Sequence, residues 1–202
     1  MNLSTPVLAS APKTDQIIAA TRSLFVRYGY RRTSVDDIAR EAGVAKATLY
    51  LHFSGKEEMF REMIRRFQLA QEQRCASAET TTGPLERRVT AFLDAVYGTA
   101  LSWFGNSEHI EELKSFAAGE ATIPTDDPIR IFGQRLALLL QQADAAGEVS
   151  LARAGQSASD VATTLFFAAY GAKHATGATL ESFHDALPGI VYLILAGITP
   201  AG

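Results

Sequence analysis

Apolar residues recur at spacings of three and four along most of this 202-residue chain, which is the pattern of amphipathic helices. In the first such segment, Ile17, Leu24 and Phe25 fall on one side of a helix. Thr14 is expected to cap this helix, and Gly29 to end it in the left-handed conformation. No segment shows the alternation of apolar and polar residues that predicts a strand. The sequence therefore predicts an all-α fold.

Eight further helices are expected, and several are placed by a residue that can cap them. Ser34, Ser54 and Ser157 are each followed three residues later by Asp or Glu, the spacing of a capping box. Pro188 and Gly189 lie inside the last apolar pattern, where a proline is expected to kink the helix or to delay its start. The eight segments begin at residue 34 and then cover residues 45–53, 54–75, 84–104, 107–120, 126–146, 157–177 and 179–198.

Residues 33–56 are the most informative stretch, because they predict two short helices joined by a glycine turn. Ala39, Gly43 and Leu49 stand at relative positions 0, 4 and 10. They supply a small residue at the helix crossing, a glycine that tolerates positive φ and an apolar side chain that returns to the crossing. Two helices that cross in this way present the second one to the major groove of DNA.

The two sides of this predicted helix pair have different compositions. The inner side is expected to form one small core from Leu24, Phe25, Val35, Ile38, Val44, Leu49 and Phe53. The outer side of the second helix is expected to present Lys46, Ala47, Thr48, Tyr50, Leu51 and His52. Capping residues and exposed polar groups together favour a DNA-binding helix pair over a plain helical hairpin.

The overall net charge of −3 is unusual for a nucleic-acid binder, but the charge is distributed unevenly along the chain. Residues 13–74 carry 12 Lys and Arg against 8 Asp and Glu, a net charge of +4, whereas the remainder carries 7 against 14, a net charge of −7. A basic N-terminal third on an acidic body gives one part of the molecule that attracts phosphate.

Composition narrows the class of protein further. No apolar run approaches the roughly 18 residues needed to span a bilayer, and the first residues lack the features of a secretory signal. Residues 1–12 are instead expected to form a disordered tail. Cys75 is the single cysteine, which excludes an internal disulfide and a cysteine-based zinc cluster. A structural thiol and a reducing, cytoplasmic location are expected.

The segments TSVDDIA (33–39), AGV (42–44) and ATLYLHF (47–53), with Lys56 and Glu57, resemble the TetR family of one-component repressors. The match runs from about residue 14 to about residue 60. The resemblance implies a helix-turn-helix domain over residues 13–60, and a body over residues 61–202 that binds an effector and dimerises. A helix from residue 55 would link the two. The implied function is a repressor that binds a palindromic operator as a homodimer and is released by a small, largely apolar effector.

The candidate phosphate contacts combine this resemblance with side-chain chemistry. Thr33 or Ser34 offers a hydroxyl and a backbone N–H at a helix N-terminus. Tyr50 and His52 are expected to reach backbone phosphates, as similar positions do in the family. Lys56 places a cation beside a helix N-terminus, and a bound phosphate would relieve that unfavourable arrangement. A DNA contact is therefore expected for Lys56 as well.

Lys46, Ala47 and Thr48 are the candidates for contact with base edges, because lysine suits guanine and methyl groups suit thymine. In the alternative interpretation, Tyr50 packs its ring inside the protein and Lys46 is merely solvated. Ala45 departs from the family, which often has Ser or Thr at this cap position. The departure removes a helix cap and a possible phosphate contact.

Two groups of residues are expected in the body. The resemblance places the dimer seam on the last two helices, with the candidates Phe167, Gly171, Ala175, Leu187, Val191 and Leu195. An effector pocket has apolar walls and a few polar groups. Its candidates are Trp103, Phe104, Phe116, Phe132, Phe166, Tyr170 and His174. For both groups, an ordinary intramolecular core is the competing interpretation.

Two other classes of protein stay open. An enzyme is disfavoured because the sequence has no nucleophile elbow, phosphate loop or cluster of metal ligands, and His109 and His174 are isolated. A helical interaction module without DNA binding is the second alternative, and it would tolerate alanine at Tyr50 and Lys56. No cofactor and no metal are expected.

Overall fold

The structure, a computed structural model, describes residues 12–119 and 128–199, and all regular elements within these ranges are helical. The all-α prediction is confirmed. The tail expected over residues 1–12 and the helix start expected at residues 126 and 127 fall almost entirely outside the described residues.

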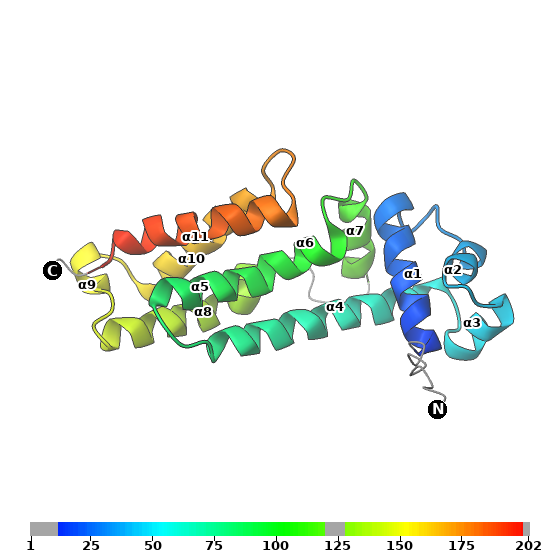
Figure 1. Cartoon of the computed structure of the whole chain (residues 1–202), viewed down its shortest axis with the longest axis horizontal. Coiled ribbons are helices and arrows are strands. Elements are labelled where there is room, and N and C mark those ends of the chain that lie inside the picture. The colour runs from blue at the N-terminus through cyan, green and yellow to red at the C-terminus, as the bar shows by residue number, and fades with distance from the viewer. Residues whose placement is uncertain (1–11, 120–127, 200–202) are drawn as a thin grey trace, which may run out of the picture.

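Three helices, of which the second and third are short, form a compact N-terminal unit at one end of an elongated molecule (Figure 1). They are α1 (Lys13–Tyr28), α2 (Val35–Glu41) and α3 (Lys46–His52). The long helix α4 (Lys56–Glu79) leaves this unit and runs along the body (Figure 1).

The body contains the remaining helices. The segments α5 (Leu85–Leu93), the π-helical turn η1 (Asp94–Gly98) and α6 (Thr99–Phe104) follow one another without a break. The helices after them are α7 (Ile110–Gly119), α8 (Pro128–Ala145), α9 (Leu151–Ala154), α10 (Ala158–Lys173) and α11 (Leu180–Ala196). With α5, η1 and α6 taken as one, the described residues form ten helices, one more than the sequence predicted; the additional one is the four-residue α9.

Several predicted helix ends need correction. Helix α1 begins at Lys13 with Pro12 as its N-cap, so Thr14 lies inside the helix. Ser54 bonds to Glu58, through its backbone N–H and its hydroxyl, because α4 begins one residue later than its capping box would require. Pro188 lies within α11 and does not delay its start, since a capping box at Thr179 fixes that start.

The buried apolar side chains form two separate clusters. One lies among α1, α2, α3 and the first half of α4, with contributions from α6 and α7, and it contains the predicted core residues Leu24, Phe25, Ile38, Leu49 and Phe53. The other lies among α5, α8, α10, α11 and the second half of α4. Helix α4 contributes to both clusters, so it connects the N-terminal unit to the body.

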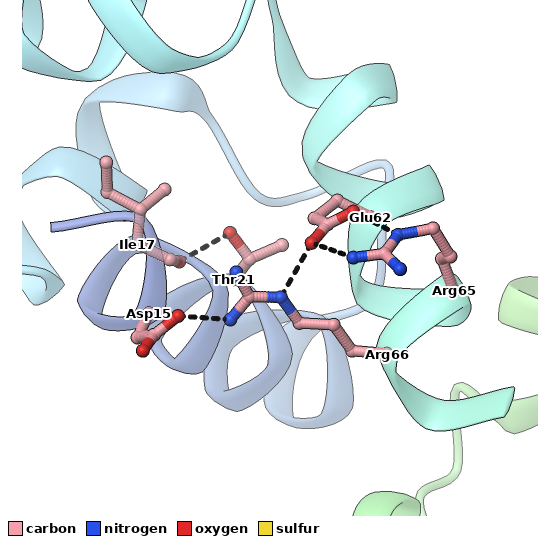
Figure 2. A network of polar contacts seen from close by, with 6 residues as sticks. All are labelled: Asp15, Ile17, Thr21, Glu62, Arg65 and Arg66. Atoms are coloured by element: carbon pink, nitrogen blue, oxygen red, sulfur yellow. Dashed lines mark hydrogen bonds and ion pairs between the residues drawn. The ribbon is translucent and has the colours of Figure 1, made fainter. Parts of the chain in front are cut away.

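A polar network fixes α1 against α4 (Figure 2). The Arg66 guanidinium on α4 donates to Asp15 Oδ1 on α1 at 2.7 Å and to Glu62 Oε1 at 2.7 Å. Arg65 donates two hydrogen bonds to the same Glu62 carboxylate. These bonds hold the pKa of Glu62 down at about 2, because the Arg65 hydrogen bond favours the ionised form.

Helix α7 packs against the loop between α1 and α2, so the body contacts the N-terminal unit at a second place. The Arg31 N–H donates to Glu112 Oε1 at 2.9 Å, and the Phe116 ring stacks on Tyr30 with 3.9 Å between ring centroids. Gly29 permits this approach, since a Cβ there would lie 2.3 Å from Glu112 Oε2.

Candidate nucleic-acid interface

The turn between α2 and α3 has the geometry that the motif requires. Ser34 caps α2 in a complete capping box with Asp37. Gly43 adopts φ +63°, and the Val44 N–H donates to the Ala39 carbonyl at 3.0 Å. Leu49 is fully buried and anchors α3 to the core. The two helices are therefore held in a fixed crossing from which the rest of α3 projects.

The direction of each α3 side chain follows from the position of Leu49. A helix turns by about 100° per residue, so Ala47 and Leu51 lie about 160° and 200° around from Leu49, on the side farthest from the core. Thr48 and Tyr50 lie about 100° to either side of Leu49. The exposures agree, because Tyr50 is 50% exposed and Leu51 is 82% exposed. The alternative in which Tyr50 packs inside the protein is thus excluded.

Lys46 and His52 lie at the flanks of α3, about 60° from Leu49. His52 is exposed. The Lys46 ammonium forms an ion pair with Asp36 Oδ1 of α2 at 2.8 Å, and the hydrogen bond to Asp36 raises the pKa of Lys46. Lys46 is therefore not merely solvated. Asp36 was not among the candidate residues, because only the crossing of α2 over α3 brings it beside Lys46.

The structure corrects the expected roles of Thr33 and Lys56. Thr33 is buried, and its hydroxyl donates to the Gly29 carbonyl at 2.8 Å, so the hydroxyl is not available to a phosphate. The Lys56 ammonium donates to the carbonyls of Tyr30 at 2.8 Å and Thr33 at 2.9 Å, and it lies 4.2 Å from the centre of the Tyr30 ring. Burial lowers the pKa of Lys56.

Thr33 and Lys56 therefore stabilise the loop between α1 and α2 by donating hydrogen bonds to carbonyls of the protein itself. Ser34 is exposed, but its hydroxyl already donates to the Asp37 carboxylate at 2.6 Å as part of the helix cap. Ala45 is the N-cap of α3 and makes no side-chain hydrogen bond, as expected from its missing hydroxyl.

A hollow of about 380 Å³ lies beside the motif rather than in the body. It is lined by Leu24, Tyr28, Arg32, Thr33, Asp37, Arg40 and Glu41. Its lining includes two arginines and two acidic residues, and Arg40 forms an ion pair with Asp37.

The seven candidate pocket residues do not come together in one pocket. Trp103, Phe104 and Phe116 belong to the N-terminal cluster, because α6 and α7 reach back to α1 and α4. Phe132 and Phe166 belong to the core of the body. Tyr170 and His174 are exposed on α10, where their rings lie 4.1 Å apart. The grouping was wrong since helical spacing alone does not show which helix each aromatic residue meets.

The candidate dimer residues divide into two sets. Phe167, Gly171 and Ala175 are exposed on α10, with Phe167 at 64%. Leu187, Val191 and Leu195 are buried in the body's own core, so for these three the intramolecular alternative is correct. The large apolar side chains that α11 exposes are instead Tyr192 at 61% and Leu193 at 72%.

Two classes of site are absent from the part of the chain that the structure describes. No three His, Cys, Asp or Glu side chains lie close enough together to hold a metal ion. None of the helices within the same residues has the length and apolar character to cross a bilayer.

Comparison with known proteins points to one family. Residues 17–63 match the family model of bacterial regulatory proteins, tetR family. The transcriptional repressor KstR2 of Mycolicibacterium smegmatis is 33% identical over 86 residues, which is 41% of each chain. The biofilm operon regulator IcaR of Staphylococcus epidermidis is 40% identical over 50 residues, 25% of this chain and 27% of that protein. The matched segments span less than half of these relatives.

Solved structures resemble nearly the whole chain. A TetR-like transcriptional regulator from Rhodococcus sp. RHA1 has a TM-score of 0.61 at 21% identity, over 95% of this chain and 100% of that one. A gamma-butyrolactone receptor (ArpA like protein) has a TM-score of 0.64 at 20% identity, over 94% of this chain and 89% of that one. At such identities the likeness concerns the fold.

Proposed function

Because the chain belongs to the TetR family of transcriptional regulators, we propose that it is a repressor that binds a palindromic operator as a homodimer. A small, largely apolar effector bound in the body releases it from DNA. The observation that carries the proposal is α3, a helix anchored by one buried leucine whose other side chains project from the protein.

The DNA contacts follow from the directions of the α3 side chains. Ala47 and Leu51 project farthest toward a major groove, and Thr48 and Tyr50 lie beside them, so that methyl and hydroxyl groups can contact base edges and phosphates. His52 and Lys46 stand at the flanks, within reach of the two backbones. The Lys46–Asp36 ion pair opens when a phosphate replaces the carboxylate, at little cost because both side chains are more than half exposed.

The homodimer uses the apolar residues that α10 and α11 leave uncovered. Phe167, Tyr192 and Leu193 are large side chains exposed by more than half. Gly171 adds a place where a second helix can approach closely. Two copies related by a twofold axis would bury these residues and present two copies of α3 to successive major grooves on one face of DNA.

Release operates through the two connections between body and N-terminal unit. Helix α4 extends from the motif into the core of the body, and α7 holds the α1–α2 loop through Glu112 and Phe116. The segment before α7 adds a hydrogen bond from the Ser107 hydroxyl to the Val26 carbonyl at 2.6 Å. An effector that shifts α6 and α7 would therefore turn α2 and α3 relative to their counterparts in the dimer.

Selection of binding sites from a random duplex library with the full chain tests this function. The expected product is an inverted repeat, bound specifically and less tightly as salt rises. Tyr50→Ala should abolish specific binding without lowering the melting temperature, whereas Tyr28→Ala, at a tyrosine of similar exposure on α1, should retain it. Enrichment of no sequence would favour an interaction module without DNA binding, and specific binding that Tyr50→Ala leaves intact would remove Tyr50 from the DNA contact.

A further inference from the structure

Leu51 is the most exposed large apolar side chain in the described residues, at 82%. It makes no contribution to either buried cluster. Single apolar residues on a surface are common, but this one lies in the middle of a seven-residue helix whose flanking residues, Tyr50 and His52, are both polar. Leu51 therefore lies on the part of α3 that would face DNA in the proposed complex.

Leu51 and Ala47 together form the outermost ridge of α3. They are four residues apart, so they lie one above the other on the side of the helix opposite Leu49. The part of α3 that would enter a groove first is thus made of an isobutyl group and a methyl group, with no hydrogen-bonding atom. The hydroxyls of Thr48 and Tyr50 lie to either side of this ridge.

We propose that Leu51 determines part of the operator sequence by packing against the C5 methyl groups of thymine, an inference that rests on the proposed function. The thymine methyl is the one apolar group that a base pair presents in the major groove. A leucine placed there gains by burying it, whereas a cytosine in its place presents an amino group that would lose its hydrogen bond to water. Ala47 supports the same preference on the adjacent base pair.

The experiment uses an operator obtained by selection with the wild-type chain and replaces each thymine in turn by deoxyuridine, which lacks only the C5 methyl. Wild-type protein should lose about fourfold in affinity at one or two positions of each half-site, the factor for one buried methyl group. Replacement in both half-sites should cost about fifteenfold. For Leu51→Ala the same replacements should change affinity by less than twofold, because the methyl no longer has its partner.

Two controls make the result specific. Leu69→Ala removes a leucine that is 48% exposed on α4, outside the proposed DNA and dimer surfaces, and should leave the wild-type response intact. If Leu51→Ala binds too weakly to measure, selection repeated with that variant should yield sites that have lost the thymine preference at those positions alone.

The outcomes separate this inference from the function on which it rests. If the wild-type chain selects no operator, the regulator proposal fails. The wild-type chain can also select an operator whose affinity no deoxyuridine replacement changes, or whose affinity falls equally for Leu51→Ala and wild type. In either case Leu51 does not recognise thymine, and the regulator proposal stands.

Discussion

At the scale of single residues, Lys56 shows how a charged group in a recognition motif can act through the protein rather than on its ligand. Its ammonium donates hydrogen bonds to two carbonyls of the loop between α1 and α2. The Tyr30 carbonyl lies near the start of this loop and the Thr33 carbonyl near its end, so Lys56 fixes the loop that leads into α2. A positively charged donor strengthens such bonds compared with a neutral one.

Lys56→Gln is therefore expected to destabilise the N-terminal unit by about 1–2 kcal/mol, the value of charge-assisted hydrogen bonds partly exposed to water. The slope of the logarithm of operator affinity against the logarithm of salt concentration should stay unchanged, since the ammonium contacts no phosphate. Chemical denaturation and binding titrations at several salt concentrations measure the two quantities. A slope reduced by about 1 would instead place Lys56 on a phosphate.

At the scale of elements, the fixed relation of α1 to α4 depends on an ionised carboxylate. The pKa of Glu62 is about 2 in the folded protein, compared with an ordinary value of 4.5. Because the folded pKa is the lower one, the network stabilises the fold fully above about pH 4.5, and this contribution declines as the pH falls toward 2. Asp15 and Arg66 join the two helices through the same network (Figure 2).

Glu62→Gln should lower the free energy of unfolding at pH 7 by about 1–2 kcal/mol. The shift in pKa sets an upper limit near 3 kcal/mol, and solvent screening reduces it. The difference from wild type should shrink steadily between pH 4.5 and pH 3, as measured by chemical denaturation. Glu181→Gln, at an exposed glutamate of α11, is the control and should show no such trend. A difference that is constant with pH would show that the glutamine disturbs packing rather than charge.

The contact of α7 with the α1–α2 loop can be tested at Gly29. Alanine there is strained by φ +81°, and its Cβ also collides with Glu112, so Gly29→Ala should destabilise the protein by more than about 1 kcal/mol. Gly43→Ala also requires a positive φ, of +63°, but its Cβ would have no neighbour within 4 Å, so it serves as the control that makes no contact with α7. When Glu112→Ala is also present, the loss of unfolding free energy caused by Gly29→Ala should be smaller, and the loss caused by Gly43→Ala should be unchanged. If Gly29→Ala destabilises the protein equally with and without Glu112→Ala, the Glu112 side chain of α7 does not limit the space at Gly29.

The elements that the sequence predicted well are those whose signals are local. Capping boxes at Ser34 and Ser157 and the glycine at position 43 each depend on neighbours within a few residues. The direction of the Lys56 side chain depends instead on Tyr30, 26 residues away along the chain. A motif can therefore locate a helix correctly while giving the wrong partner for one of its side chains.

The candidates in the body failed for a related reason. An apolar stripe such as Leu187, Val191 and Leu195 indicates which side of a helix is covered, but the covering surface can be the same chain or a second copy. Only the packing of α11 against α5 and α10 shows that this stripe is internal. The opposite side of α11 carried no regular apolar pattern in the sequence, so Tyr192 and Leu193 did not stand out.

At the scale of the whole molecule, the exposed apolar face of α10 and α11 is the proposed dimer interface, and it would set the spacing between the two copies of α3. Leu193→Glu places a carboxylate on this face, and twofold symmetry would bring two such charges into one interface without partners. The variant should be monomeric by sedimentation or light scattering, with its own melting transition retained. It should lose specific operator affinity at least a hundredfold, because a single α3 contacts only one half-site. Leu69→Glu, on the exposed side of α4, should remain dimeric and bind normally. If the wild-type chain is monomeric, or if Leu193→Glu dimerises as wild type does, the uncovered face of α10 and α11 is not the dimer interface, and the two copies of α3 must be spaced by some other contact.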